Sequence, residues 1–329
     1  MKVLITGGTG FIGSRLALDC LQKGDSVSVI GQENNGAESE NRKSIETKGG
    51  KIVIGSVTDR QRVFAAVKGA DVVYHLAAAQ HEANIPDQTF WDVNVAGTKN
   101  VIEASLSARV RRFVHGSTIG VYGSSLQGRL DEQSPLKPDN IYGVTKLEAE
   151  KIVRSFNEKL EVVVIRISET YGPGDRRLLK LFRGINKNAF PIIGNGHNMH
   201  HLVYIGDLIQ GLHLAATEEE AIGKVLVLSG KEALTTSVMI ETIAMEMGKR
   251  SPRLRLPLLP FLMLATVTET LCRPIGIQPP LHRRRMDFFR KSFLFSQEQS
   301  KRVLGFAPRV SFKEGVAETA KWYRAMGYI

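Results

Sequence analysis

Tyr142 and Lys146 stand four residues apart in the stretch DNIYGVTKLEAE, which has the pattern of the start of a helix. Positions i and i+4 lie about one turn apart on the same side of a helix, so a phenol and an ammonium here can reach one small group. The alternative is a solvated surface pair, which this spacing often produces by chance. The two residues alone do not decide between a functional pair and a surface pair, because a short motif is a hypothesis that depends on its structural context.

The stretch LITGGTGFIGSRLAL places Gly7, Gly10 and Gly13 between an apolar run and a helical pattern. Such a loop must turn sharply out of a strand, approach a pyrophosphate closely and let the following helix pack on the sheet. A side chain would obstruct each of these requirements. The N-terminus of the helix then offers amide groups and a favourable dipole to the phosphates. Because the motif heads a series of strands and helices, it predicts a dinucleotide site.

Short runs rich in valine and isoleucine alternate with segments of helical periodicity through the first half of the chain. The runs are KVLIT, SVSVI, KIVIG, DVVYHLA, RRFVHGS and VVVIRIS. This rhythm is typical of βαβ units, so we expect an α/β protein with a Rossmann-type, doubly wound parallel sheet.

Proline and glycine interrupt this rhythm beyond about Tyr171, and one further strand-like run, KVLVLSG, follows a helical segment. We therefore expect a dinucleotide-binding domain over 1–170, rejoined by parts of 200–230. A smaller C-terminal substrate-binding domain is expected over 171–199 and 231–329.

The chain of 329 residues carries a net charge of +11, with the excess in clusters such as RVRRF, GDRRLLK, GKRSPRLR and HRRRMDFFRK. No nucleic-acid-binding motif accompanies these clusters, and aromatic residues are not interleaved as a base-stacking surface requires. We therefore expect no nucleic-acid partner and attribute the charge to attraction of an anionic cofactor or small-molecule substrate.

The two cysteines, Cys20 and Cys272, give neither a disulfide framework nor metal-ligand spacing, so no metal site is expected. The N-terminus leads directly into the first apolar run and the glycine loop rather than into a signal peptide. These features predict a cytoplasmic protein.

The apolar stretch LPLLPFLMLATVTETLC raises the question of a membrane contact. It is too short to span about 30 Å of hydrocarbon and contains Pro257, Pro260 and Glu269, so no transmembrane segment is expected. A buried helix or a lid is the favoured interpretation. Peripheral docking on a membrane is the weaker alternative, because arginines flank the run on both sides. They are Arg250, Arg253, Arg255 and Arg273.

Further motifs follow along the chain: HLAA at 75–78, NVAGT at 94–98, STIGVYG at 117–123, YGPGD at 171–175, and LGFAP with EGVAETAKWY near the end. With TGGTGFIG and the Tyr142 and Lys146 pair, the chain resembles the extended short-chain dehydrogenase/reductase superfamily over nearly its whole length. That superfamily includes the NAD-dependent epimerase/dehydratase family. The pattern GNGxN and the apolar segment followed by PPLHRRR look closer to its 3β-hydroxysteroid dehydrogenase-like branch.

The resemblance implies an NAD(P)-dependent oxidoreductase that moves hydride reversibly at a secondary alcohol or ketone. Tyr142 would be the general acid/base, Lys146 would favour its phenolate and hold the nicotinamide ribose, and Thr118 would hydrogen-bond the reacting oxygen. The implied cofactor-binding residues are Gly7, Gly10, Phe11, Ile12, Gly13, Gly31, Gln32, Ser56, Val57, Leu76, Ala77, Ala78, Asn94, Tyr142 and Lys146. Asn94 has a purely structural alternative, a bond to the backbone within a helix, and His75 is interpreted as structural.

Cofactor selectivity depends on the residue after the second strand, where a carboxylate usually binds the adenosine ribose of NAD. This chain has Gly31 and Gln32 there, and Ser56 stands where the family carries an adenine-contacting aspartate. Without a carboxylate a 2′-phosphate meets no repulsion, and Arg42 is a nearby cation. NADP is therefore slightly favoured, although Glu33 leaves NAD open.

Nucleotide-sugar members commonly present an arginine to the substrate diphosphate after GNG, but this chain has His200 and His201 there. The loss of that clamp, together with the apolar stretch, favours an apolar, alicyclic substrate. The alternative is a nucleotide-sugar epimerase or dehydratase, with a different arginine as the clamp. Candidate substrate residues are Ser117, Glu169, Arg176, His200 and Arg283, with Arg177, Arg284 and Arg285 as neighbouring cations.

A non-catalytic NAD(P)-binding regulator or scaffold is the alternative of another class. It would keep the fold and lose the chemistry, and the intact set of Thr118, Tyr142 and Lys146 weighs against it. The resemblance also implies a homodimer, packed through the helix after NVAGT and the helix over 142–156.

Overall fold

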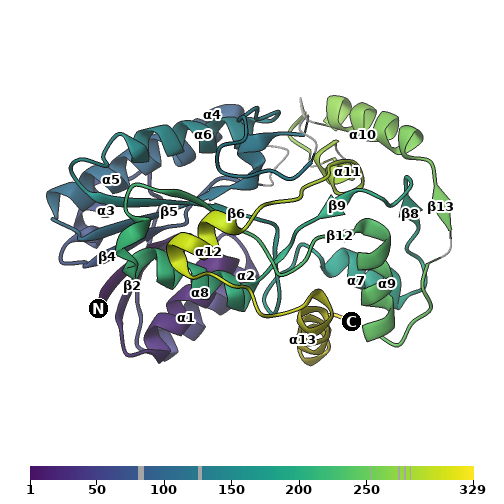
Figure 1. Ribbon diagram of the computed structural model, residues 1–329, viewed down its shortest axis with the longest axis horizontal. Coiled ribbons are helices and arrows are strands. Elements are labelled where there is room, and N and C mark those ends of the chain that lie inside the picture. Colours follow the sequence, from purple (N-terminus) through teal and green to yellow (C-terminus); the bar gives the residue numbers. More distant parts are fainter. Residues whose placement is uncertain (81–84, 125–127, 253, 273–274, 278, 282) are drawn as a thin grey trace.

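A seven-stranded parallel sheet forms the centre of the larger part of the molecule (Figure 1). The computed structural model describes residues 1–329 apart from 81–84, 125–127, 253, 273–274, 278, 282 and the side chains of Arg284 and Arg285. The strands are β1 (Lys2–Thr6), β2 (Ser26–Gly31), β3 (Lys51–Ile54), β4 (Val72–His75), β5 (Arg112–Thr118), β6 (Glu161–Ile167) and β11 (Val225–Leu228). Their order is β11-β6-β5-β4-β1-β2-β3, so the direction of winding reverses between β1 and β4. The predicted Rossmann-type, doubly wound α/β fold is confirmed.

Helices cover both faces of this sheet. The strands carry apolar side chains on both faces, so each face must be shielded from water. One face packs against α1 (Phe11–Gln22), α2 (Gly36–Thr47) and α8 (Ile205–Thr217). The other packs against α3 (Arg60–Val67), α5 (Gly97–Ser107) and α6 (Ile141–Arg154). Shorter elements are α4 (Asp87–Phe90), the π-helical turn Trp91–Ala96, and the 3₁₀ turns Ile119–Tyr122 and Glu219–Ala221.

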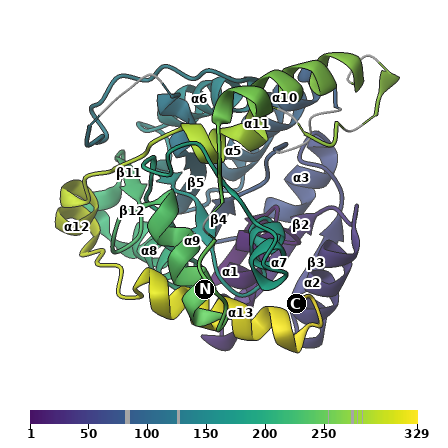
Figure 2. The ribbon, with the colours of Figure 1, turned by 90° about the vertical axis from the view of Figure 1, so that its right-hand side faces the viewer.

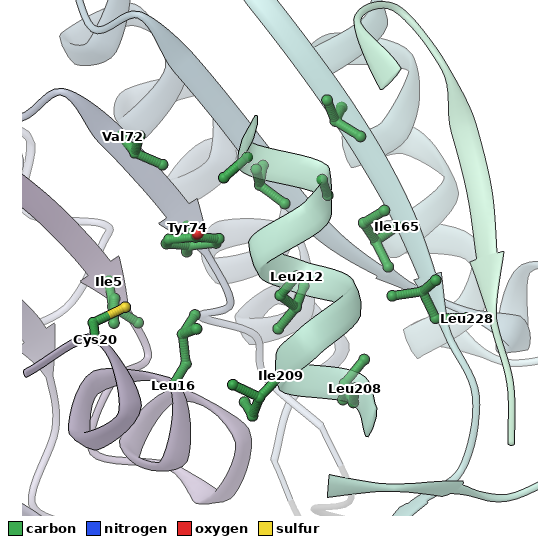
Figure 3. Close-up of a cluster of buried hydrophobic side chains, with 14 of the residues drawn as sticks. Ile5, Leu16, Cys20, Val72, Tyr74, Ile165, Leu208, Ile209, Leu212 and Leu228 are labelled. Atoms are coloured by element: carbon green, nitrogen blue, oxygen red, sulfur yellow. The ribbon is translucent and has the colours of Figure 1, made fainter. Parts of the chain in front are cut away.

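The core beneath α8 shows how the later part of the chain rejoins the sheet (Figure 3). Leu208 and Leu212 of α8 are buried in the same apolar cluster as Leu16 of α1, and Leu208 lies beside Leu228 of β11. Each fully buried leucine contributes roughly 1.5–3 kcal/mol through removal of apolar surface from water. Side chains of residues 205–228 therefore pack into the core of the sheet domain.

A second, smaller core lies beside the sheet domain and is built from helices (Figures 1 and 2). Its helices are α7 (Leu179–Asn186), α9 (Thr236–Glu246) and α13 (Phe312–Ala325). Two-residue strands pair around them: β7 (Thr170–Tyr171) with β10 (Val203–Tyr204), β8 (Ile192–Ile193) with β13 (Arg255–Leu256), and β9 (Met199–His200) with β12 (Leu234–Thr235). The helices α10 (Leu258–Cys272) and α11 (Arg283–Arg290) lie at the outer edge.

The predicted substrate-binding span 231–329 assumed that the whole C-terminal region packs with this smaller core. The structure shows that one part of it does not. The helix α12 (Glu298–Leu304) returns to the sheet domain, where Val303, Leu304 and Phe306 are buried in the same core as α8. The chain then crosses back, and α13 completes the smaller core. The two parts are thus interlaced by several crossings of the chain.

Phe306→Ala tests this interlacing. Because Phe306 is buried against α8, its removal leaves a cavity in the nucleotide-binding core and should lower the free energy of unfolding by about 3–5 kcal/mol. Urea unfolding followed by circular dichroism measures this loss. Phe261→Ala, at a half-buried position on α10, is the control and should cost clearly less. Equal small losses in both variants would place Phe306 outside the core.

Candidate active site

The loop between β1 and α1 has the geometry that a dinucleotide phosphate requires. Gly7 has a φ of +67°, and a Cβ built there would lie 2.7 Å from the backbone nitrogen of Ala77. A Cβ on Gly13 would lie 2.3 Å from the carbonyl oxygen of Gly7. The helix α1 begins at Phe11, and its N-cap residue is Gly10, which has no side chain to accept from the first amides. These amides therefore remain available to a phosphate group. Only glycines fit this loop, and the residues present fit the phosphates of a dinucleotide.

The other predicted cofactor residues gather along the same edge of the sheet. Gly31 and Gln32 stand at the end of β2, Ser56 and Val57 follow β3, and 76–78 follow β4. Because the strands are parallel, these carboxyl ends lie along one edge of the sheet, near the point where the strand order reverses. Phe11 and Ile12 lie half-buried in the first turn of α1 beside it.

His75 fixes the loop after β4 through a chain of hydrogen bonds. The amide of Ala77 donates to Thr6 Oγ1, which lies 2.7 Å from His75 Nδ1. His75 Nε2 lies 2.8 Å from Thr98 Oγ1, which donates to the carbonyl of Asn94. Burial and the charge of Lys146 lower the pKa of His75 to about 3, so the ring is neutral. The interpretation of His75 as a structural residue is confirmed.

Asn94 supports the same loop from behind. Its side-chain oxygen accepts from the amide of Ala79 (2.8 Å), and its nitrogen donates to the Ala79 carbonyl (3.2 Å) and to Thr145 Oγ1 (3.0 Å). The side chain is completely buried. It therefore ties the loop after β4 to α6 and has no exposed surface for the expected direct contact with a cofactor.

The N-terminus of α6 places Tyr142 against the end of β5. Asn140 caps the helix by accepting from the amide of Gly143, 2.9 Å away. A Cβ on Gly143 would lie 2.6 Å from the Gly120 carbonyl oxygen, so the helix packs directly on the turn after Thr118. A Cβ on Gly120 would lie 3.4 Å from Thr118 Oγ1 and 3.9 Å from Tyr142 Cδ1. Thr118 and Tyr142 thus flank the same glycine.

Lys146 lies one turn further along α6, and its side chain is only 1% exposed. Its ammonium donates to the carbonyl of Gly116 (2.7 Å) and lies 3.4 Å from His115 Nε2. Burial lowers the pKa of Lys146 to about 8, against the opposing influence of the Glu150 carboxylate. The lysine is therefore predominantly charged at neutral pH. Burial and this charge hold the pKa of His115 well below its ordinary value, so His115 is neutral.

Glu150 completes the same face of α6, at position i+8 from Tyr142, and sequence reasoning missed it. Its carboxylate accepts from Ser117 Oγ and binds Arg166 of β6 through two contacts of 3.2 and 3.0 Å. Arg166 also donates to the hydroxyl of Tyr122 (2.9 Å). Glu150 and Arg166 are each 2% exposed or less, so this is a buried ion pair. The spacing of 142, 146 and 150 was the available signal.

Ser117 was expected to be a substrate residue, but its side chain is turned into the protein interior. It is buried and donates to Glu150. Successive residues of a strand point to opposite faces, and the neighbouring Thr118 is the one that stays accessible. Thr118 Oγ1 accepts from the Gly120 amide (3.1 Å), which leaves its own hydrogen to donate.

Glu169 and His200, two of the predicted substrate residues, form a pair. His200 Nδ1 lies 2.9 Å from Glu169 Oε2, and the carboxyl group is 33% exposed. Burial acts to raise the pKa of Glu169, but His200 and the charge of Arg177 together lower it, so the group is ionised. His200 Nε2 also lies 3.0 Å from Thr236 Oγ1, and Phe288 stacks on the ring.

Arg177 is the cation that reaches this pair. Burial acts to lower the pKa of Arg177, but the charges of Asp175 and Glu169 and the Tyr142 phenol raise it above its ordinary value. The guanidinium contacts Asp175 (3.2 Å), and its side chain remains 44% exposed. Of the substrate residues expected from the sequence, Glu169 and His200 therefore form one pair, and the charge of Arg177 interacts with both Glu169 and Tyr142.

The other predicted substrate residues lie elsewhere. Arg176 pairs with Glu40 of α2 (2.7 Å) and lies over the ring of Tyr328. Arg283 pairs with Glu269 of α10 (3.3 Å). The side chains of Arg284 and Arg285 lie outside the described part of the chain, as do Arg253 and Arg273.

The apolar stretch was expected to form a buried helix or a lid. It forms α10, in which only Ala265 is buried among the described side chains. Leu259, Met263 and Leu264 are exposed to solvent. The prediction of a buried helix was therefore wrong.

Comparison with known proteins gives a consistent result. Residues 3–228 match the profile of the NAD dependent epimerase/dehydratase family. A dTDP-glucose 4,6-dehydratase of Streptomyces niveus is 29% identical over 98% of this chain and 93% of its own length. A 3beta-hydroxysteroid-dehydrogenase/decarboxylase isoform 2 of Arabidopsis thaliana is 28% identical over 96% of this chain and 61% of its own length.

Solved structures share the whole fold. A UDP-glucuronic acid 4-epimerase from Bacillus cereus in complex with NAD superposes with a TM-score of 0.80 and 24% identity. The superposition covers 99% of each chain. At this identity the likeness concerns the fold.

Glu150→Gln tests the buried network behind Lys146. The change leaves the Arg166 guanidinium buried without a carboxylate and should lower the free energy of unfolding by about 3–5 kcal/mol. Glu148→Gln is the control on the same helix, because Glu148 is exposed and pairs only with Lys151, and it should cost less than about 1 kcal/mol. Similar urea midpoints for both variants would contradict the network.

The same variant should change the pH dependence of turnover. The Glu150 carboxylate raises the pKa of Lys146, so its removal lowers that pKa below about 8. The ammonium is then lost at lower pH, and the alkaline limb of the turnover profile should move to lower pH. A limb unchanged from the wild type and from Glu148→Gln would show that Glu150 does not support the charge on Lys146.

Proposed function

Because this chain belongs to the NAD dependent epimerase/dehydratase family, we propose that it moves hydride reversibly at a secondary alcohol carbon of a polyhydroxylated, sugar-like substrate. The observation that carries the proposal is the ionised Glu169, which pairs with His200 and is acted on by the charge of Arg177. The charge of Arg177 also interacts with Tyr142. The glycine loop 7–13 and the residues after β2, β3 and β4 would hold a nicotinamide cofactor, which would supply the acceptor or donor of the hydride.

The residues of this chain supply the proton transfer and the positioning. Tyr142 takes the proton of the substrate hydroxyl as hydride leaves its carbon, and returns the proton in the reverse direction. Lys146 keeps a positive charge beneath the phenol, which favours the phenolate. The hydroxyl of Thr118 donates to the reacting oxygen and fixes it against Tyr142.

The surroundings of Tyr142 favour a hydroxylated substrate over the apolar one that the sequence had favoured. A carboxylate accepts hydrogen bonds from hydroxyl groups, and Arg177 offers an exposed cation to an anionic part of the same molecule. The apolar alternative combined the loss of the clamping arginine with an apolar lining from α10, but α10 exposes most of its large apolar side chains to solvent. The dehydratase and epimerase relatives are consistent with a nucleotide sugar, and a simple dehydrogenase is the second candidate.

A thermal-shift screen with cofactor present tests this proposal. UDP- or dTDP-sugars should raise the melting temperature by mass action, and steroid-like or other apolar alcohols should not. The reverse pattern would overturn the proposed substrate class. Glu169→Gln should reduce the shift produced by the sugar, whereas Glu148→Gln should leave it unchanged.

Tyr142→Phe separates an enzyme from a non-catalytic binding protein. The variant should keep the cofactor and the ligand-induced shift but lose turnover of the identified ligand by at least roughly 10²-fold. Unchanged turnover would remove Tyr142 from the chemistry. Ligand binding without any turnover in the wild type would favour a regulator or scaffold.

For the cofactor, we infer that NADPH binds at least as tightly as NADH. The strand β2 ends at Gly31, so no carboxylate at that position repels a 2′-phosphate. Arg42 stands nearby, although it is paired with Glu33 (2.7 Å). Fluorescence titration of both reduced cofactors measures the preference, and a clear preference for NADH would show that another group selects against the phosphate.

A paired substitution examines the same position directly. A Cβ on Gly31 would lie 2.4 Å from Thr9 Oγ1, so an aspartate there needs space. Gly31→Asp combined with Thr9→Ala should therefore shift the preference towards NADH, with Thr9→Ala alone as the control. No shift would mean that the residue at 31 does not face the adenosine ribose.

A further inference from the structure

The exposed apolar side chains of this protein are concentrated in one segment. Eight large ones in the described part of the chain lie within residues 254–277, namely Leu254, Leu259, Met263, Leu264, Val267, Leu271, Ile275 and Ile277. The other exposed ones are scattered singly over the rest of the described residues. A soluble monomer seldom exposes so continuous an apolar surface, which indicates a contact with something else.

A somewhat longer segment around these residues also carries most of the net charge. Residues 249–291 contain ten lysines and arginines and two acidic residues, so they hold +8 of the chain's +11. Both acidic residues are engaged: Glu269 pairs with Arg283, and Asp287 pairs with Arg290 and Lys291. Exposed apolar side chains and an excess of cations therefore fall within one segment of the chain. We call the described part of this segment, from α10 to Lys291, the α10–α11 surface.

The position of α10 leaves its apolar sides accessible. Figures 1 and 2 show it at the outer edge of the molecule, with α11 between it and the catalytic helix α6. Lys291, directly after α11, anchors this edge through contacts of 2.9 Å to Asp139, just before α6. The α10–α11 surface is thus attached to the enzyme at one side and open at the other.

The polar groups of α10 are compatible with an apolar environment. The hydroxyls of Thr266, Thr268 and Thr270 donate to carbonyls four residues earlier, at 2.8–2.9 Å. They therefore need no water to satisfy their hydrogen bonds. The helix has 15 residues and is about 22 Å long. Of the described helices, none combines the length and the apolar character that crossing a membrane requires.

We infer that the α10–α11 surface docks on the anionic surface of a lipid bilayer. The apolar side chains of α10 enter the boundary of the acyl chains, and the arginines and lysines of the segment meet the phosphate headgroups. A second copy of this chain fits less well, because a symmetric contact would bring together two copies of a segment whose sequence carries a net charge of +8. The inference does not depend on the proposed function.

Co-sedimentation with vesicles tests this inference on the full chain. The protein should sediment with vesicles of phosphatidylcholine and phosphatidylglycerol at low salt, and less with phosphatidylcholine alone or at high salt. Met263→Glu should lower the partition coefficient at least roughly tenfold, because it places a charge in the apolar boundary. Met245→Glu is the matched control, since Met245 on α9 is 64% exposed and Met263 is 63% exposed. Its partition should stay close to that of the wild type.

Several results would overturn the inference. They are the absence of sedimentation with the anionic vesicles, an equal loss in the two variants, or no loss in Met263→Glu. Both positions are exposed, so both variants should fold, and their melting temperatures check this. Light scattering tests the competing occupant, a second copy of this chain. If the wild type forms a dimer, does not bind vesicles and is dissociated by Met263→Glu, the surface is assigned to that second copy.

Discussion

The buried ammonium of Lys146 is the constraint on which the catalytic end of this protein depends. A charge removed from water is costly unless hydrogen bonds and an opposite charge compensate it. Here the Gly116 carbonyl accepts from Nζ, and Glu150 lies one turn further along the same helix. The neighbouring His75 and His115 stay neutral, because burial and the lysine itself prevent a second positive charge.

This arrangement links elements that are far apart in the sequence. The residues around Lys146 come from the end of β5 and from α6, and Glu150 binds Arg166 of β6. On the other side, His75 and Asn94 fix the loop after β4, which lines the cofactor groove. Asn94 also binds Thr145, the residue before the lysine. The proposed proton-transfer residues and the loop after β4 are therefore positioned by one hydrogen-bonded interior.

Local patterns in the sequence predicted the parts of the structure that depend on short-range geometry. The glycine loop, the alternation of strands and helices and the spacing of Tyr142 and Lys146 all follow from turn, sheet and helix periodicities. The orientation of Ser117 was also within reach, because Thr118 and its neighbour must point to opposite sides of β5. Glu150 was hidden only because a glutamate on a helix usually faces water.

Long-range packing accounts for what the sequence did not indicate. Composition showed that the stretch forming α10 is apolar, but only the tertiary structure shows that it faces solvent. The return of α12 to the sheet domain and the interaction of Arg177 with Tyr142 likewise depend on how distant segments meet.

Lys146 is desolvated and yet still charged at neutral pH, and the proposed chemistry of the site depends on this property. An NMR titration of labelled lysine side chains, with Lys146→Met to assign the resonance, measures this directly. A midpoint near pH 8 is the result the structure predicts, and a midpoint near the ordinary lysine value of about 10.4 would contradict it.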